Sequence, residues 1–228
     1  MPSQIINTVI ITFIIISIGC TAISIYYHNY LYSQALSESN KMKIILENLA
    51  LRTIQSLPTK LELNLKYGTL NFIDEGIVIV RINNTAIHSF KKLSVTYTCK
   101  FNIHTNIESI ISQSSQYNIT ALNNVLKLMF NIKITSRCNQ IIISIIEIKS
   151  SIKQIIRGKL VFQCDVNYIE KYYAPIQNST YMIEIIDNDR VSRYSFNASL
   201  TKPMELIVKI ITVEVSTIWV ELLSLIQS

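Results

Sequence analysis

A long apolar run near the N-terminus constrains this chain more than any other feature. Residues 5–25 read IINTVIITFIIISIGCTAISI, and the first charged side chain is Glu38. A helix of about 20 residues, rising 1.5 Å per residue, spans the hydrocarbon of a bilayer. A secretory signal peptide has a basic segment before a shorter apolar core, whereas this run is long and no basic residue precedes it. We therefore predict an uncleaved, single-pass membrane anchor.

A group of tyrosines follows the apolar run directly. Tyr26, Tyr27, Tyr30 and Tyr32 stand where the helix would leave the hydrocarbon. Tyrosine favours this interface because its ring is apolar and its hydroxyl group can remain hydrated. The four residues are predicted to form a membrane-interface belt.

The helix is predicted to continue beyond the membrane as an amphipathic segment over residues 26–57. Its apolar residues recur with a spacing close to 3.6, and no Gly or Pro interrupts it. Pro58 disfavours helical geometry at Leu57 and is expected to end the helix there. The charged and polar residues are assigned to the solvent-facing side, namely Glu38, Lys41, Glu47, Arg52 and Gln55. The chain thus divides into an anchor helix (residues 1–57) and a head domain (residues 58–228).

The head has the alternating pattern of β-strands. Apolar and polar residues alternate over 61–67, 93–103 and 160–168, and turn residues occur at 74–76, 83–84 and 187–189. The pattern over 107–129 instead favours one or two helices broken near Tyr117. A strand over 204–215 slips in phase near Ile210, which suggests a bulge. The predicted fold class is α+β, with a long N-terminal helix followed by a β-sandwich-like head with a helical insertion.

Two sequence features disagree about the side of the membrane on which the head lies. Asn-x-Ser/Thr sequons occur at Asn83, Asn118, Asn178 and Asn197, in or near predicted turns, and favour an extracellular head. The positive-inside rule points the other way, because Lys41 and Lys43 follow the apolar run and no basic residue precedes it. Both lysines lie well beyond the tyrosine belt, so we expect the head to be extracellular.

Two cysteines lie on the apolar phase of predicted strands. Cys99 and Cys164 would either form a disulfide between the sheets or remain as buried free thiols. No Cys-x-x-Cys spacing is present, which argues against a zinc site. The sequence leaves the two alternatives open.

The composition argues against several classes of function. Only four glycines occur among 228 residues, too few for a phosphate-binding loop, and the sequence contains no recognised catalytic motif. The net charge of +6 comes from scattered basic residues, whereas nucleic-acid binding concentrates them on one face. We therefore predict no enzymatic activity, no catalytic, cofactor-binding or metal-binding residues, no cofactor and no nucleic-acid partner.

The order of parts resembles the archaeal type IV pilin-like superfamily, which includes pilins, archaellins and membrane-bound archaellum stator proteins. The resemblance covers the apolar helix, its amphipathic continuation and the helix start SQIINTVII. The bias toward Ile, Asn, Ser, Tyr and Lys is similar to that of surface proteins of thermophilic archaea. Pilin precursors carry a basic residue and Gly before the helix, whereas only MPSQ stands there in this chain. This difference favours a protein that stays in the membrane.

The resemblance implies a structural or interaction protein of the cell surface, either a subunit or an accessory of a type IV pilus-like filament. Its partners would be membrane lipid, further copies of the chain, and pilus or S-layer components. The alternative is a membrane-anchored extracellular ligand-binding or receptor protein, and a viral origin is compatible with the same composition.

Overall fold

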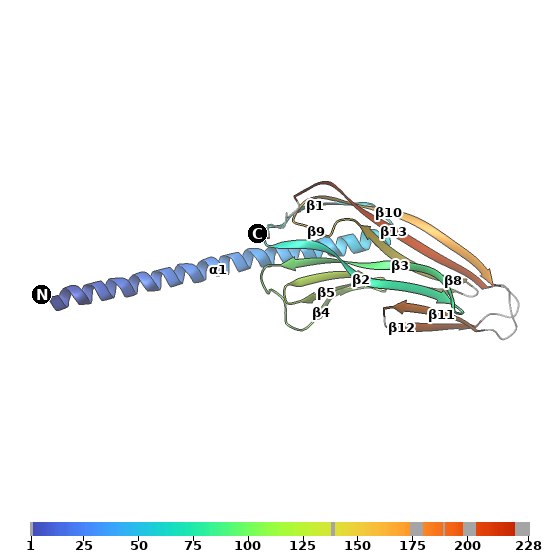
Figure 1. The fold of residues 1–228 in the computed structure, drawn as a ribbon, viewed down its shortest axis with the longest axis horizontal. Helices are drawn as coiled ribbons and strands as arrows, with labels where there is room; N and C mark the ends of the chain where they lie inside the picture. The colour runs from blue at the N-terminus through green and yellow to red at the C-terminus, as the bar shows by residue number, and fades with distance from the viewer. Residues whose placement is uncertain (1, 138–139, 174–179, 189, 198–203, 222–228) are drawn as a thin grey trace.

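The computed structural model describes residues 2–137, 140–173, 180–188, 190–197 and 204–221. A single continuous helix, α1 (Pro2–Ile54), forms the N-terminal region. Its first half projects from the molecule, and its second half lies against the strands of the head (Figure 1). The prediction of a long apolar helix followed by a mostly-β domain is confirmed.

The helix ends at Ile54 rather than at Leu57, with the geometry of a Schellman motif. Ser56 has a φ of 59°, and the N–H of Leu57 donates to the carbonyl of Arg52 at 2.9 Å. This bond satisfies a carbonyl group that a helix end would otherwise leave without a partner. Pro58 then directs the chain out of the helix and into the first strand.

The strands of the head form two sheets. The smaller sheet has the order β1–β10–β13–β8–β7, and the larger has the order β12–β11–β2–β3–β6–β5–β4, with β9 paired to β2. β13 runs parallel to β8, and the other pairings are antiparallel. The bounds are β1 (Thr59–Asn64), β2 (Gly68–Ile82), β3 (Thr85–Cys99), β4 (Ser109–Gln113), β5 (Tyr117–Leu122), β6 (Val125–Phe130), β7 (Lys133–Arg137), β8 (Gln140–Ser150), β9 (Gln154–Ile155), β10 (Arg157–Tyr173), β11 (Thr180–Asp187), β12 (Arg190–Asn197) and β13 (Met204–Glu221).

Two of the predicted hairpins are present. β2 and β3 are joined by Asn83-Asn84, whose φ values of 45° and 68° match a two-residue type I′ turn. Asparagine tolerates this left-handed geometry better than most residues. β11 and β12 form the hairpin predicted around residues 187–189.

The buried face of the long strands changes half-way along their length. Buried residues alternate up to Ile210 and then again from Ile211 in β13, and β8 changes phase between Ile145 and Ile146. Ile210 pairs with Ile145 and Ile211 with Ile146, so both strands change the face that they bury at the same paired positions. The predicted phase slip is therefore present, but the bulge predicted there is wrong. The register irregularity of β13 lies opposite Lys159/Leu160 of β10.

This change of face divides the interior into two cores. In the distal core the two sheets pack directly on each other, through residues such as Val80, Phe90, Ile143, Ile183 and Val208. In the proximal core the second half of α1 packs with residues of both sheets, including Met42, Leu46, Leu49, Tyr97, Leu128, Phe162 and Val213. The anchor helix is thus part of the proximal core.

Two local predictions are wrong. Residues 107–129 contribute to β4, β5 and β6 and contain no helix, because pairing with β3 and burial of alternate residues outweigh the helical spacing of the apolar side chains. Residues 74–76 form a bulge within a continuous β2 rather than a turn between strands. Gly76 occupies this bulge with a φ of 112°, which other residues rarely adopt.

Candidate membrane anchor and its junction with the head

The first half of α1 has the exposure expected of a membrane-spanning helix. The head buries none of its most apolar window, and side chains such as Phe13 and Ile23 are 72% and 70% exposed. Transfer of a side chain of this size out of water is favourable by about 1.5–3 kcal/mol. By length and composition, α1 is a candidate single membrane span.

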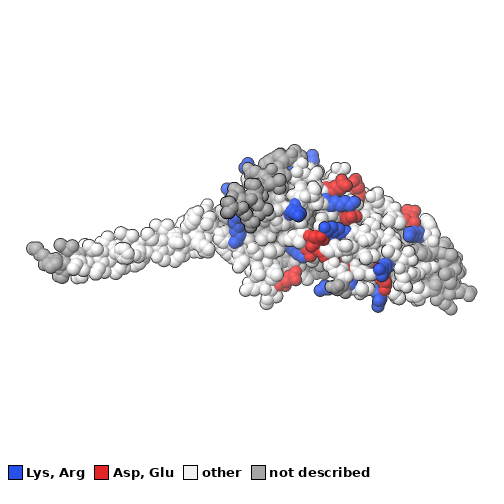
Figure 2. All heavy atoms as spheres, in the orientation of Figure 1, with Lys and Arg blue, Asp and Glu red and all other residues white. Residues whose placement is uncertain are grey.

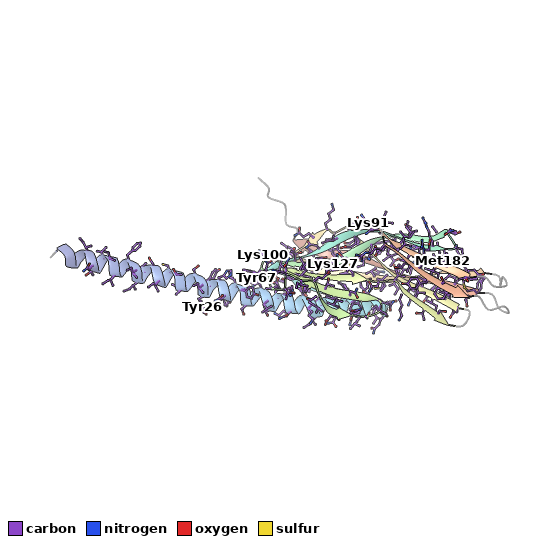
Figure 3. The ribbon with its side chains drawn as sticks, turned by 90° about the horizontal axis from the view of Figure 1, so that it is seen from below. Tyr26, Tyr67, Lys91, Lys100, Lys127 and Met182 are labelled. Carbon is purple, nitrogen blue, oxygen red and sulfur yellow. The ribbon has the colours of Figure 1, made fainter. Side chains whose placement is uncertain are left out.

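The predicted tyrosine belt follows this span and reaches the edge of the head. Tyr26, Tyr27 and Tyr30 are exposed, and Tyr26 lies on the part of the helix outside the head (Figure 3). Tyr32 is the least exposed of the four, and its ring lies 6.4 Å from that of Phe101, edge-on. Three of the tyrosines are thus exposed on the helix, while the fourth contacts the head.

Phe101 joins the head to the helix just beyond the apolar run. Its ring lies 6.0 Å from the ring of His28 and 6.3 Å from that of Tyr67, in addition to the contact with Tyr32. Aromatic pairs in such geometries contribute about 0.5–1.5 kcal/mol each beyond the area that they bury. The head therefore contacts α1 only a few residues after Ile25.

Glu38 fixes the helix to the head through its carboxylate. Oε2 accepts a hydrogen bond from the N–H of Lys66 at 2.7 Å, and Oε1 accepts one from the hydroxyl of Tyr97 at 2.9 Å. The N–H of Tyr67 lies 3.2 and 3.3 Å from the two oxygens. We call these four residues the Glu38 cluster. The assignment of Glu38 to the solvent-facing side of the helix was wrong.

Tyr97 is fully buried beneath this junction. Burial, and then the hydrogen bond to Glu38, raise the pKa of Tyr97 far above its usual value, so the hydroxyl remains a donor. Gly68 lies against the ring, and a Cβ atom at this position would be 2.4 Å from Cε2 of Tyr97. The absence of a side chain at residue 68 therefore makes room for the tyrosine.

A second polar contact lies one residue further along the helix. Ser39 Oγ lies 3.3 Å from Nε2 of His104, and the N–H of His104 donates to the carbonyl of Asn123 at 2.7 Å. Burial lowers the pKa of His104, which favours the neutral imidazole. The segment after β3 is thus held between α1 and the β5–β6 turn.

A polar network on the larger sheet connects β2, β3 and β6. Glu75 accepts hydrogen bonds from Ser94 at 2.6 Å and from Lys127 at 2.8 Å, while Asn188 donates to its carbonyl at 2.6 Å. Burial alone would raise the pKa of Glu75, but the hydrogen bonds from Lys127 and Ser94 outweigh it and lower the pKa. The network fixes the β2 bulge to the β11–β12 turn.

A cavity of about 260 Å³ opens beside the distal core. Lys92 and Asp187 form an ion pair in its wall, and Arg190 contributes a further cation. The cavity combines these charges with an apolar floor, and its lining includes Val78, Phe90, Phe130, Ile146, Ile185 and Tyr194. This combination is typical of small-molecule sites, although the volume is just below their usual range of about 300–1,000 Å³.

The sequons have different structural settings. Asn83 is exposed in the β2–β3 turn, although its Oδ1 accepts a hydrogen bond from the N–H of Met182 at 2.9 Å. Asn118 lies within β5 rather than in a loop, and its Oδ1 is buried without a hydrogen-bond partner. Asn197 ends β12, and Asn178 lies outside the described residues. Asn83 is thus more exposed than Asn118.

The structure has free thiols at the two cysteines considered for a disulfide. Cys99 is buried at the end of β3, and Cys164 on β10 is partly exposed, with its Sγ 3.5 Å from the carbonyl of Leu57. Burial raises the pKa of the Cys164 thiol, which disfavours the reactive thiolate. The free-thiol alternative is the one that the structure contains.

Among the described residues, no group of three or more His, Cys, Asp or Glu side chains is placed to hold a metal ion. Comparisons with protein-family models, with curated proteins and with solved structures found no match.

Proposed function

We propose that this chain is a membrane-anchored structural protein of the cell surface, related in design to pilin-like subunits or their membrane-retained accessories. The observation that carries the proposal is the continuity of α1. One helix supplies both the uncovered apolar half and part of the proximal core of the head. A head attached in this way has no flexible linker to the membrane.

This rigid attachment suits a mechanical role. The helix contains no Gly or Pro between Gly19 and Pro58, and the Glu38 cluster and Phe101 hold it at two levels. A structural subunit needs a fixed orientation of its head, and the continuous helix supplies one. The sandwich-like head would then contact copies of the chain, pilus components or an S-layer.

An extracellular position of the head is part of the proposal. The exposed Asn83 in a tight turn is accessible to a glycosyltransferase, and it supports this orientation.

The first test asks whether the apolar half of α1 spans the membrane. We would replace Ile15 and Ile16 together by Arg, which costs about 2.5–3.5 kcal/mol per residue at the centre of a span. The control replaces Ile44 and Leu51, which are exposed apolar residues in the second half of the same helix. We expect the first variant to be released from membranes by alkaline carbonate and the control to be retained. Retention of both variants would contradict the proposal.

The second test separates a filament subunit from an accessory. Cells that express the full chain would be sheared, and the filament and membrane fractions compared by immunoblotting, with chemical cross-linking of neighbours beforehand. Cross-linked partners in either fraction are expected. A chain without protein neighbours in both fractions would contradict a structural role.

A second candidate function is supported by the cavity beside the distal core. Its lining combines Arg190 and the Lys92–Asp187 ion pair with an apolar floor, an arrangement in which Arg190 could bind a small organic anion. Chemical shift changes confined to these residues on titration with small aromatic carboxylates would favour the ligand-binding alternative.

A further inference from the structure

The head contacts α1 shortly after the apolar run ends at Ile25, and this places the head close to the membrane surface. At 1.5 Å per residue, His28 lies about 5 Å and Tyr32 about 10 Å beyond Ile25 along the helix. The headgroup layer is about 5–8 Å thick on each side of the hydrocarbon. Phe101 contacts both rings, so it lies near the outer edge of the headgroup layer if the apolar run fills the hydrocarbon.

Two lysines adjoin the aromatic residues of this contact. Lys100 precedes Phe101 and Lys66 precedes Tyr67, and the N–H of Lys100 donates to the carbonyl of Tyr67 at 2.7 Å. The two segments therefore lie side by side at the end of the head from which the helix emerges, where Figure 3 labels Lys100 and Tyr67. Basic atoms are visible at this end in Figure 2. We call Lys66, Lys100 and Phe101 the base of the head.

The lysines of the base are available for an external anion. Both residues are exposed, and neither ammonium group forms an ion pair with a carboxylate of the described chain. The nearby carboxylate of Glu38 is occupied by the backbone N–H groups of Lys66 and Tyr67 and by Tyr97. Each lysine also carries a flexible four-carbon stem that can extend toward the lipid.

We propose that the base of the head rests on the membrane that α1 spans, with Lys66 and Lys100 binding the phosphate groups of anionic phospholipids. Phe101, which follows Lys100 in the sequence and contacts the rings of His28, Tyr32 and Tyr67, would lie at the interface, where aromatic rings are favoured. The inference rests on the proposed membrane span, and it adds that the head is docked on the lipid surface rather than held away from it. The attraction of one adjacent lysine to an anionic surface changes the ratio of docked to undocked heads about fivefold.

The test uses the full chain in lipid nanodiscs. A fluorescent amino acid replaces Asn102, an exposed residue next to the base, and the lipid carries a quencher on its headgroup. Quenching is compared between phosphatidylcholine and a mixture of phosphatidylcholine with phosphatidylglycerol. The test variant is Lys66→Glu with Lys100→Glu. The matched control is Lys60→Glu with Lys171→Glu, which changes the same charge at exposed positions on β1 and β10.

We expect stronger quenching in the anionic discs and its reversal at high salt, because salt screens the attraction. In the test variant alone, the ratio of docked to undocked heads should fall about twentyfold or more. Circular dichroism and protease resistance of the head verify that both variants fold. Equal quenching in the two lipid mixtures, or an equal loss in test and control variants, would overturn the docking. If the chain fails to co-elute with the discs, the proposed span fails as well, so the two failures are distinguishable.

Discussion

Replacement of Glu38 by alanine is expected to loosen the head from its anchor helix. The substitution leaves the buried hydroxyl of Tyr97 and the half-buried N–H of Tyr67 without their acceptor, while the N–H of Lys66 lies on an exposed residue and can reach water. A buried donor without a partner costs about 1–3 kcal/mol. We therefore expect a loss of about 2–5 kcal/mol in the unfolding free energy of the head, measured by proteolysis across a urea series in micelles.

A double-mutant cycle isolates the bond between the carboxylate and the tyrosine. Tyr97→Phe removes the donor, and its coupling to Glu38→Ala should be about 1.5–3 kcal/mol, the value of a hydrogen bond to a charged group. Glu47→Ala on the same helix is the control, because Glu47 forms no hydrogen bond or ion pair with the described residues. A loss below about 0.5 kcal/mol for Glu38→Ala, or additive effects in the cycle, would show that the Glu38 carboxylate does not hold the head to the helix.

Three further predictions concern the stability of the head, each read as a shift in the urea midpoint. Gly68→Ala should cost about 1–3 kcal/mol, because its Cβ meets the Tyr97 ring at 2.4 Å, whereas Gly19→Ala meets nothing within 4 Å and should be tolerated. Folding raises the pKa of Tyr97, so the protonated hydroxyl contributes to the unfolding free energy below about pH 10, and this contribution is lost as the pH rises further. Tyr97→Phe should therefore show a smaller decline in stability above about pH 10. The pKa of Glu75 is lowered on folding, so its contribution is lost as the pH falls below about 4.5, and Glu75→Gln should be less sensitive to acid than the unmodified chain.

The features that could be predicted from the sequence depend on neighbouring residues. The apolar run, the absence of Gly and Pro after it, and the Asn83-Asn84 turn each specify a local structure through the residues themselves. The same holds for the alternation over residues 160–166 of β10, whereas Tyr168, which the pattern placed on the apolar side, is 59% exposed. It also holds for the phase slip near Ile210, which reports a real change of the buried face.

The features that could not be predicted depend on contacts between distant segments. Residues 107–129 have helical spacing, but they form strands because β6 pairs with β3, β5 with β6 and β4 with β5. Glu38 is a polar residue on a helix, and only the fold brings the N–H groups of Lys66 and Tyr67 and the hydroxyl of Tyr97 to it. One signal in the sequence did mark Glu38, because it is the first charged residue of the chain and stands just past the tyrosine belt.

The most direct test of the membrane-anchored surface protein is protease shaving of intact cells that express the full chain, with mass spectrometry of the released and retained peptides. We expect release of peptides from residues 60–228, retention of the apolar half of α1, and sugar on peptides that contain Asn83. Full protection of the head in intact cells, with cleavage only after lysis, would place it in the cytoplasm and contradict the account.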